Sequence, residues 1–286
     1  MAYQERPFSF SKHIDPKRTA LTWSLPFTLS HPAAVVPIRR YLVFSAAVVG
    51  SLAPDFRYFL NLAPHGHFGH SFKGVFLFCL PVSLIVLWIF QQFMKLPLIS
   101  LAPKSHQERF VGFAKPFCWR GVRRFGLIVI SIVLGSIIHL AWDAFTHDRG
   151  LVVRNVPDLR TPLEEFGTHR PIYNVLQHGS SLLGLALLAF WYWRWFKRTP
   201  PQPVPPQLRM STRAKHWITG SILVIATGSS AVYAYFYSYH LASLGIFVGT
   251  FAVTSMSLIY IGALIFSAWW QLKVPVQIKV FETQRK

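Results

Sequence analysis

The sequence predicts an all-α, polytopic membrane helix bundle with five clear spans, preceded by a first short span or helical hairpin. Only 14% of the residues are charged, whereas 52% are hydrophobic. A soluble domain normally needs about a quarter of its residues charged to cover its surface. The apolar residues form long runs, and the bases lie in the connections between these runs. Helices that face hydrocarbon account for each of these observations.

The five spans follow from the lengths of the apolar runs. A helix that crosses a membrane needs about 20 mostly apolar residues. Four runs reach this length: residues 74–94, 125–145, 217–237 and 241–270. A fifth run, residues 180–196, is shorter but continuously apolar, and it ends in the cluster WYWRWF, which is typical of the membrane interface.

The first apolar stretch, residues 31–60, allows two interpretations. It is interrupted by prolines and arginines, namely Pro37, Arg39, Arg40 and Pro54. It can form one short span over residues 41–59. It can also form a hairpin with arms at residues 32–38 and 43–52 and a bend near the two arginines.

Loop charge orients the spans. The connections 95–124 and 194–215 hold seven and six bases, and the tail after Trp270 holds four. The positive-inside rule therefore favours a cytoplasmic position for these three segments. The loop 147–177 balances four bases with four acids and should face outward.

The N-terminal forty residues complicate this assignment. They hold six bases, which favours a cytoplasmic N-terminus and the single span. The hairpin needs an outward N-terminus, but it brings His31 and Asp55 to the same end. The positive-inside rule therefore argues against the hairpin, which is the topology that would place these two side chains in one site.

Composition divides the chain into five parts. The sequence TPPQPVPPQ reads as a short polyproline linker between two membrane regions. The parts are a polar tail over 1–25, a motif-bearing membrane domain over 26–198, a proline-rich linker over 199–210, a two-span hairpin over 211–271 and a basic tail over 272–286.

The net charge of +19 points to lipid as a partner. A strongly basic chain can bind nucleic acid, but here the positive side chains flank membrane spans, where they meet anionic headgroups. We therefore expect contact with membrane lipid and no nucleic-acid partner. The oligomeric state does not follow from the sequence.

Ionisable residues gather on the side that is expected to face outward. They come from separate segments and belong to the residue types that bind metals. The set comprises Asp55 after Pro54, His65 and His70 in HGHFGHS, His139, Asp143 and His147 in HLAWDAFTH, and His178 just before the apolar run 180–196.

The spacing HxxxDxxxH is the most informative part of this set. Residues four apart share one face of a helix, so His139, Asp143 and His147 can point the same way, with some bend over eight residues. Imidazole and carboxylate together suit Zn²⁺, and also Mn²⁺ or Fe²⁺. An aspartate inside a span costs about 2.5–3.5 kcal/mol, so it needs a partner such as a cation. A polar network or a proton path is the alternative.

Five blocks carry a resemblance to a known family. They are PFTLSHPAAVVPIRR, GSLAPDFRYFL, GHSFKGVFLFCLP, HLAWDAFTHDRG and YNVLQHGSSLLG. Together they resemble an uncharacterised bacterial multi-pass membrane family, a domain of unknown function, over residues 26–196. That family is more distantly similar to predicted membrane-bound metal-dependent hydrolases and to zinc-dependent phospholipase C.

The resemblance implies a set of metal ligands. Asp55, His70, His139 and Asp143 would be the core ligands, and His31 would join a second metal. His147 or His178 could complete that second site. The later HxxxE of the phospholipase pattern is missing here.

We therefore expect a metal-dependent hydrolase at the outer face of a bacterial cytoplasmic membrane. A zinc-bound hydroxide, or its manganese or iron counterpart, would attack a phosphoester or other ester of a lipid-like substrate. Arg57 and Arg149 could orient an anionic substrate. The alternatives are a transporter or ion- or proton-conducting protein, and a non-enzymatic membrane scaffold.

Overall fold

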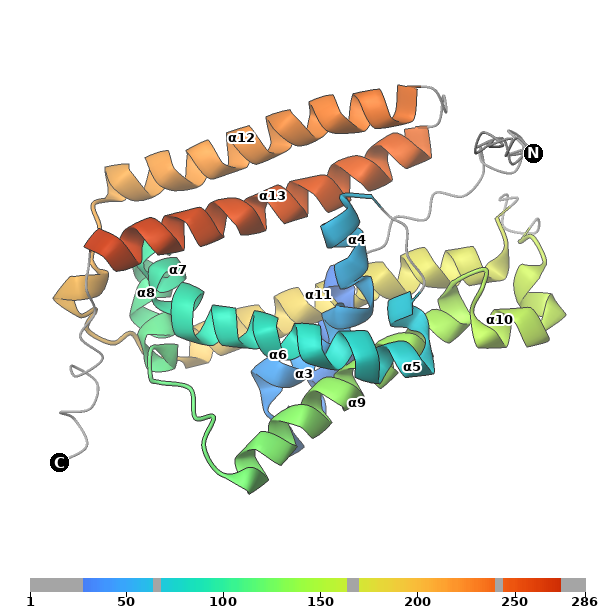
Figure 1. Ribbon diagram of the computed structural model, residues 1–286, viewed down its shortest axis with the longest axis horizontal. Helices are drawn as coiled ribbons and strands as arrows, with labels where there is room; N and C mark the ends of the chain where they lie inside the picture. The colour runs from blue at the N-terminus through green and yellow to red at the C-terminus, as the bar shows by residue number, and fades with distance from the viewer. Residues whose placement is uncertain (1–27, 64–67, 164–169, 240–243, 274–286) are drawn as a thin grey trace, which may run out of the picture.

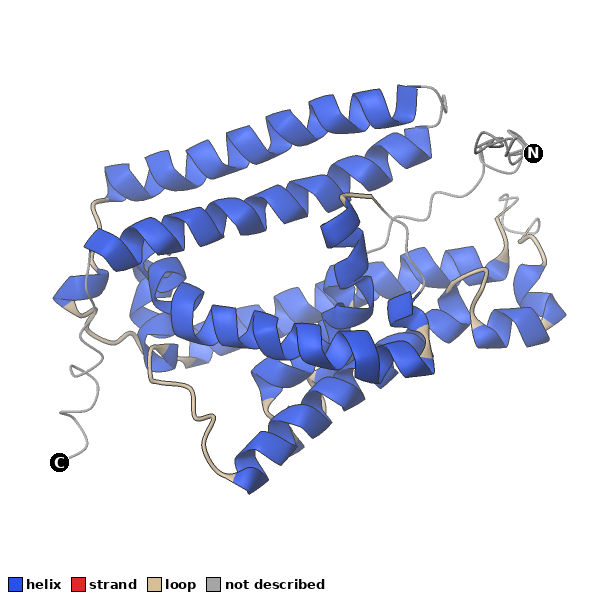
Figure 2. Cartoon of the chain, in the orientation of Figure 1, coloured by secondary structure: helices blue, strands red, loops and turns tan. Residues whose placement is uncertain are grey.

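The computed structural model describes residues 28–63, 68–163, 170–239 and 244–273, and helices are the regular elements of these residues. Figure 2 shows no strand in these residues. Five helices are long and apolar enough to cross a membrane, so the all-α, multi-pass prediction is confirmed. Their bounds are Phe72–Leu101, Val122–Asn155, Ile172–Arg198, Thr212–Tyr239 and Leu244–Lys273.

Shorter elements make up these spans and connect them (Figure 1). In chain order, the helices are α2 Pro32–Val35, α3 Phe44–Leu52, α4 Phe56–Asn61, α5 Phe72–Gly74, α6 Leu80–Trp88, α7 Lys95–Leu101, α8 Lys104–Phe110, α9 Val122–Thr146, α10 Leu151–Asn155, α11 Ile172–Arg198, α12 Thr212–Tyr239 and α13 Leu244–Lys273. The short 3₁₀ turns that bear on the site are η1 Thr28–Ser30, η3 Ala53–Asp55 and η4 Phe68–His70.

The first span runs as one rod from α5 through α6 to α7, with two π-helical stretches. These are Val75–Cys79 and Ile89–Met94. Pro81 follows the first stretch and Pro97 the second. Proline has no N–H to donate and its ring clashes with the preceding turn, so a wider π turn accommodates each residue without ending the helix.

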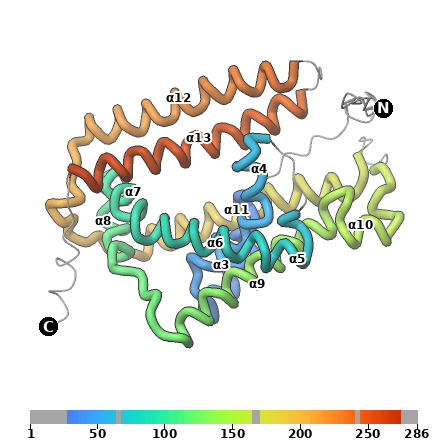
Figure 3. Tube along the Cα trace, in the orientation of Figure 1, coloured from blue at the N-terminus to red at the C-terminus, as the bar shows by residue number. Residues whose placement is uncertain are grey.

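The stretch before the first span forms the hairpin and not the single span. α3 has nine residues and is about 13 Å long, which is too short to cross a bilayer core of about 30 Å. Arg39 and Arg40 lie exposed in the bend between α2 and α3. Figure 3 shows this blue segment entering the bundle, and α3 contacts both α6 and α9. His31 and Asp55 consequently lie at the same end, and the single span favoured by loop charge is wrong.

Small residues let α3 approach α9 closely. Ala46, Ala47 and Gly50 are buried on α3 and face Ser131 and Gly135 on α9. A Cβ atom built on Gly50 would overlap a backbone carbonyl of α9, and one built on Gly135 would overlap a carbonyl of α3. Close backbone approach through small residues is a common way to pack helices in membranes. This contact fixes the position of the half of α9 that carries His139 and Asp143.

The C-terminal hairpin of α12 and α13 packs on the rest of the bundle through α13 (Figure 1). Thr254 donates a hydrogen bond to the carbonyl of Leu62 over 3.1 Å, and Ser257 donates one to the carbonyl of Phe59, also over 3.1 Å. At the other end, α13 contacts α7. The C-terminal pair is thus attached to the segment that follows Asp55.

Large apolar side chains remain exposed along the spans. Leu77 is 70% exposed, Leu182 72% and Val224 71%. Such a surface is unfavourable in water but matches the hydrocarbon of a bilayer.

Candidate metal centre

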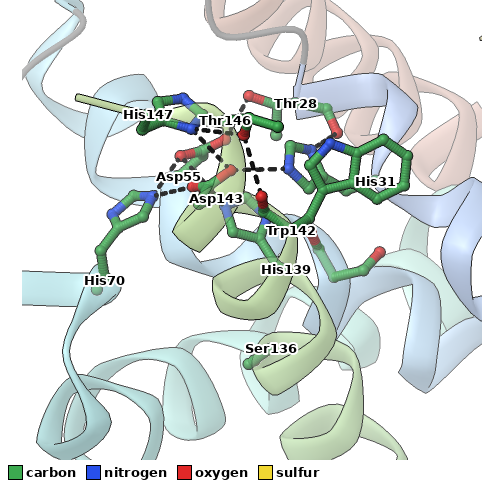
Figure 4. A network of polar contacts seen from close by, with 12 residues as sticks. Thr28, His31, Asp55, His70, Ser136, His139, Trp142, Asp143, Thr146 and His147 are labelled. Atoms are coloured by element: carbon green, nitrogen blue, oxygen red, sulfur yellow. Dashed lines mark hydrogen bonds and ion pairs between the residues drawn. The ribbon is translucent and has the colours of Figure 1, made fainter. Parts of the chain in front are cut away.

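Five ionisable side chains from four separate segments meet in one buried cluster (Figure 4). His31 precedes α2, Asp55 ends η3, His70 ends η4, and His139 and Asp143 lie one turn apart on α9. Of these side chains, His70 is the most exposed at 20%, and that of His139 is fully buried. The structure therefore brings together all five residues that the sequence analysis assigns to the core and to the second metal.

The α9 pair is held by the spacing that the sequence predicts. His139 Nε2 lies 3.1 Å from Oδ2 of Asp143. Nδ1 of His139 contacts the carbonyl of Ser51 over 2.7 Å, as a donor when it carries the proton. That contact fixes the orientation of the ring and directs Nε2 toward the carboxylates, as in the second shell of many metal-ligating histidines. The close packing of α3 on α9 brings the Ser51 carbonyl within reach.

Asp55 is positioned by the turn that follows α3. The side chain of Thr28 donates a hydrogen bond to Oδ2 of Asp55 over 2.6 Å. Oδ1 of Asp55 lies 3.1 Å from Nε2 of His70. Burial opposes ionisation of Asp55, but the charge of His139 and the hydrogen bond from His70 outweigh burial and lower its pKa. The carboxyl group is therefore ionised and ready to bind a cation.

His31 stacks directly on His139. Their ring centroids are 3.9 Å apart. Nε2 of His31 lies 3.2 Å from Oδ1 of Asp143, and its Nδ1 lies 3.2 Å from the carbonyl of Thr28. Burial and the neighbouring His139 lower the pKa of His31, because two stacked imidazoles cannot both carry charge at low cost. A neutral His31 offers a nitrogen lone pair to a cation.

Four atoms of the cluster have neighbour separations that suit the ligands of a metal ion. Asp55 Oδ1, His70 Nε2, Asp143 Oδ2 and His139 Nε2 form a closed ring with sides of 3.1, 3.2, 3.1 and 3.8 Å. Zinc bonds of 2.0–2.1 Å at tetrahedral angles separate neighbouring ligand atoms by about 3.3 Å. Two sets of three donors have ligand atoms that all lie within 4.8 Å of one another, namely His31 with Asp55 and His139, and His70 with His139 and Asp143. The side chains present therefore fit a divalent ion.

An unsatisfied nitrogen supports this fit. His139 Nε2 is buried and makes no hydrogen bond with good geometry to any described residue, although carboxylate oxygens lie close to it. A buried polar atom without a partner is costly, and a metal ion at the centre of the cluster would satisfy it. His31, Asp55 and Asp143 also line a cavity of about 20 Å³, which has room for about one water molecule or ion.

Metal binding should release a proton from His70. Burial opposes charge on this imidazole, but its hydrogen bonds with Asp143 and Asp55 outweigh burial and raise its pKa to about 10. His70 is therefore protonated at neutral pH in the metal-free protein, and an incoming ion must displace that proton. Zinc affinity, measured against a competing chelator, is expected to rise about tenfold per pH unit between about pH 6.5 and 8. An affinity that does not change with pH would contradict this role for His70.

The same shift has the opposite effect on the metal-free fold. Because the folded-state pKa lies above the ordinary value of 6.5, protonated His70 stabilises the folded state fully below pH 6.5. That contribution is lost as the pH rises through about 10.

The other residues proposed for the site lie around or outside the cluster. His147 follows the last residue of α9 in an extended conformation, and its Nδ1 lies 3.2 Å from Oδ1 of Asp143. His178 lies on α11 and is not among the residues that line the cavity. Arg57 and Arg149 are exposed and do not line it either. His65 lies outside the described residues.

Neutral side chains complete the site, and the sequence analysis did not identify them. Tyr58, Trp142 and Gln177 line the cavity with His147. Gln177 contacts Nε2 of His147 over 3.2 Å, and the ring of Tyr58 stacks on that of His70. A search for ionisable types alone passes over such residues. Tyr58 follows Asp55 by three positions, so helical spacing could have indicated it.

Comparison with known proteins identifies a family but no activity. A family model described as a domain of unknown function, DUF4184, matches residues 25–268. The match extends beyond the range 26–196 that the sequence blocks indicated, and it includes the proline linker and most of the two C-terminal spans. No curated protein and no solved structure matches the chain.

Proposed function

Because the chain belongs to that family, whose description names no activity, we propose its function from the site: the protein is a metal-dependent hydrolase of the membrane. Its substrate is a phosphoester or other ester of a lipid-like molecule. The observation that carries this proposal is the ring of four donor atoms at 3.1–3.8 Å with an unsatisfied His139 Nε2.

The donor set favours one class of metal and one kind of chemistry. Two imidazole nitrogens and two carboxylate oxygens suit Zn²⁺, with Mn²⁺ or Fe²⁺ as alternatives. Such an ion, when bound, lowers the pKa of a coordinated water toward about 7 and polarises an ester or phosphoryl oxygen. His31 is positioned beside the same cluster for a second ion, since its Nε2 faces the opposite oxygen of Asp143.

His147 is the side chain best placed to exchange a proton with a substrate. Its side chain is 34% exposed, and it is oriented by Asp143 on one nitrogen and by Gln177 on the other. In ester hydrolysis, water adds to the phosphorus or carbonyl carbon while the bond to the leaving oxygen breaks. His147 would take the proton that the attacking water gives up and donate it to that leaving oxygen.

The surroundings of the site favour a substrate with apolar chains. Phe68 and Phe72 flank His70 in sequence and are 43% and 71% exposed. Leu60, in the segment after Asp55, is 70% exposed. An apolar rim beside a polar site is suited to a molecule that lies in the membrane. Since the base-rich connections belong to the other ends of the spans, we place the site at the extracytoplasmic face of a bacterial cytoplasmic membrane.

Hydrolysis by purified protein tests the proposal. Wild-type protein in neutral detergent is expected to cleave bis(p-nitrophenyl) phosphate or a p-nitrophenyl ester, to lose this activity with a chelator, and to regain it with Zn²⁺. His147→Gln should keep the metal and lose about 10²–10⁴-fold in rate, whereas His106→Gln, at the other end of the bundle, should leave the rate unchanged. Activity that persists in the presence of chelator, or in His147→Gln, would contradict the proposal. Metal-independent ion flux in proteoliposomes would instead favour a transporter.

A further inference from the structure

Lys215 is a buried ammonium group on α12. The amino end of α12 lies at the end of the bundle near α8, opposite to the end near α5 (Figure 1). Lys215 lies in the first turn of α12 and is 8% exposed. Its Nζ donates hydrogen bonds to the carbonyl of Ala102 over 2.7 Å and to Oε1 of Gln107 over 2.9 Å. Among the described residues, no carboxylate forms an ion pair with it. The charge is thus buried next to neutral acceptors, although an ammonium can make three hydrogen bonds.

A buried charge without a counter-ion is costly, and an anion would offset that cost. Gln107, which receives one of the Lys215 hydrogen bonds, is itself 3% exposed and donates to the carbonyl of Leu208 over 2.6 Å. The acceptors of Lys215 are therefore held in place by the fold. The third N–H of the ammonium is left for a ligand.

Lys215 lines a large cavity with a positive balance of charge. The cavity has a volume of about 810 Å³ and lies between the turn from α7 to α8, the proline linker and the start of α12. Lys104 and Arg209 line it as exposed bases, and Glu108 is the acid among its described lining residues. The amino end of α12 adds a partial positive charge to the same place.

This cavity continues into an apolar groove along the spans. His216 lines both the basic cavity and a second cavity that includes Trp217 and Val224. Trp217 in turn borders a third cavity between α12 and α13, where Ile265 lies. Trp217, Val224 and Ile265 are each at least 66% exposed. A basic pocket at the end of a span is therefore joined to a path that apolar chains can follow.

We propose that this pocket binds the headgroup of an anionic phospholipid, with an acyl chain in the groove between α12 and α13. The phosphate accepts a hydrogen bond from Lys215 and forms ion pairs with Lys104 and Arg209. A free phosphate would leave the apolar groove unused, so the lipid is the occupant. The base counts of the connections place this end at the cytoplasmic leaflet, whose anionic lipids attract basic segments. The site is independent of the proposed metal centre.

Lipid titration followed by native mass spectrometry tests this inference. The purified chain in uncharged detergent is titrated with dioleoyl phosphatidylglycerol or with dioleoyl phosphatidylcholine, which share their acyl chains. Wild-type protein is expected to bind the anionic lipid about tenfold more tightly. Lys215→Gln should abolish the preference, and the exposed pair Lys104→Gln with Arg209→Gln should reduce it without removing a buried group. Lys197→Gln, an exposed base at the end of α11 outside the pocket, is the matched control and should keep the full preference.

Three results would overturn the inference. The first is equal affinity of the wild-type protein for the two lipids. The second is a full preference in both the Lys215→Gln protein and the double variant. The third is competition by glycerol 3-phosphate at concentrations similar to those of the lipid, which would show that the headgroup alone is bound. Failure of hydrolytic activity would leave all three measurements unaffected.

Discussion

Replacing His139 by glutamine is expected to lower the affinity for zinc at least about 100-fold, since even partners outside the first coordination shell contribute 10–100-fold. His139 lies at the centre of the cluster: its Nε2 is 3.1 Å from Asp143 Oδ2 and 3.8 Å from Asp55 Oδ1. The variant removes this nitrogen donor. It leaves the buried carboxylates of Asp55 and Asp143 with one imidazole fewer beside them. Zinc content after dialysis, measured by mass spectrometry of the metal, is the readout.

His106 supplies the matched control for this experiment. It lies on α8 at the other end of the bundle, where its ring contacts Tyr192 and Phe196. His106→Gln should bind zinc as the wild-type protein does. Because His139 is buried, the circular dichroism of both variants shows whether the fold is kept. A folded His139→Gln protein with wild-type zinc affinity would exclude this residue as a ligand.

Replacing Gly135 by leucine is expected to destabilise the protein by about 3 kcal/mol or more, because the side chain has no space where α9 meets α3. A Cβ atom at Gly135 would overlap the carbonyl oxygen of Ala47 and lie 2.8 Å from the nitrogen of Ser51. The helices would have to separate, and the Ser51 carbonyl would no longer hold Nδ1 of His139. We therefore expect a lower unfolding temperature in detergent together with loss of bound zinc.

Substitution of Gly126 on the same helix is the control that separates the effect of packing from the effect of helix propensity. A Cβ atom there meets no heavy atom within 4 Å. Gly126→Leu should therefore keep the unfolding temperature and the zinc of the wild-type protein. Equal unfolding temperatures for the Gly126 and Gly135 variants would show that the α3–α9 contact does not determine stability.

The spans could be predicted from sequence because run length and hydropathy are local properties. Four of the five observed spans are longer than their apolar runs, as α11 shows by beginning at Ile172 and not at residue 180. Polar residues at the ends of a span can continue a helix without adding to its hydropathy. Run length therefore identifies a span but not its ends.

The hairpin shows where sequence reasoning failed. The positive-inside rule counts bases near segments that cross the membrane, and the segment around Arg39 and Arg40 turns back without crossing. Non-helical backbone at membrane depth is tolerated when protein surrounds it, and that packing arises from α3 against α6 and α9. The small residues at positions 46 and 50 and at positions 131 and 135 are spaced four apart, and this pattern in the sequence indicates close helix contact.

The candidate site was predictable in part. The pair of His139 and Asp143 follows from helical spacing, and the ordered blocks of sequence indicated Asp55, His70 and His31. The hydrogen bond from Thr28 to Asp55 and the contact of His139 with the Ser51 carbonyl are tertiary, so no local pattern reveals them. They orient the ligands, and they are visible only once the four segments are in place.

X-ray absorption spectroscopy of the zinc-bound protein tests the central claim most directly. A site made of Asp55, His70, His139 and Asp143 predicts nitrogen and oxygen neighbours at about 2.0–2.1 Å with the multiple scattering of imidazole rings. Sulfur neighbours at about 2.3 Å, or a first shell without imidazole scattering, would show that zinc is bound elsewhere and would contradict the assignment.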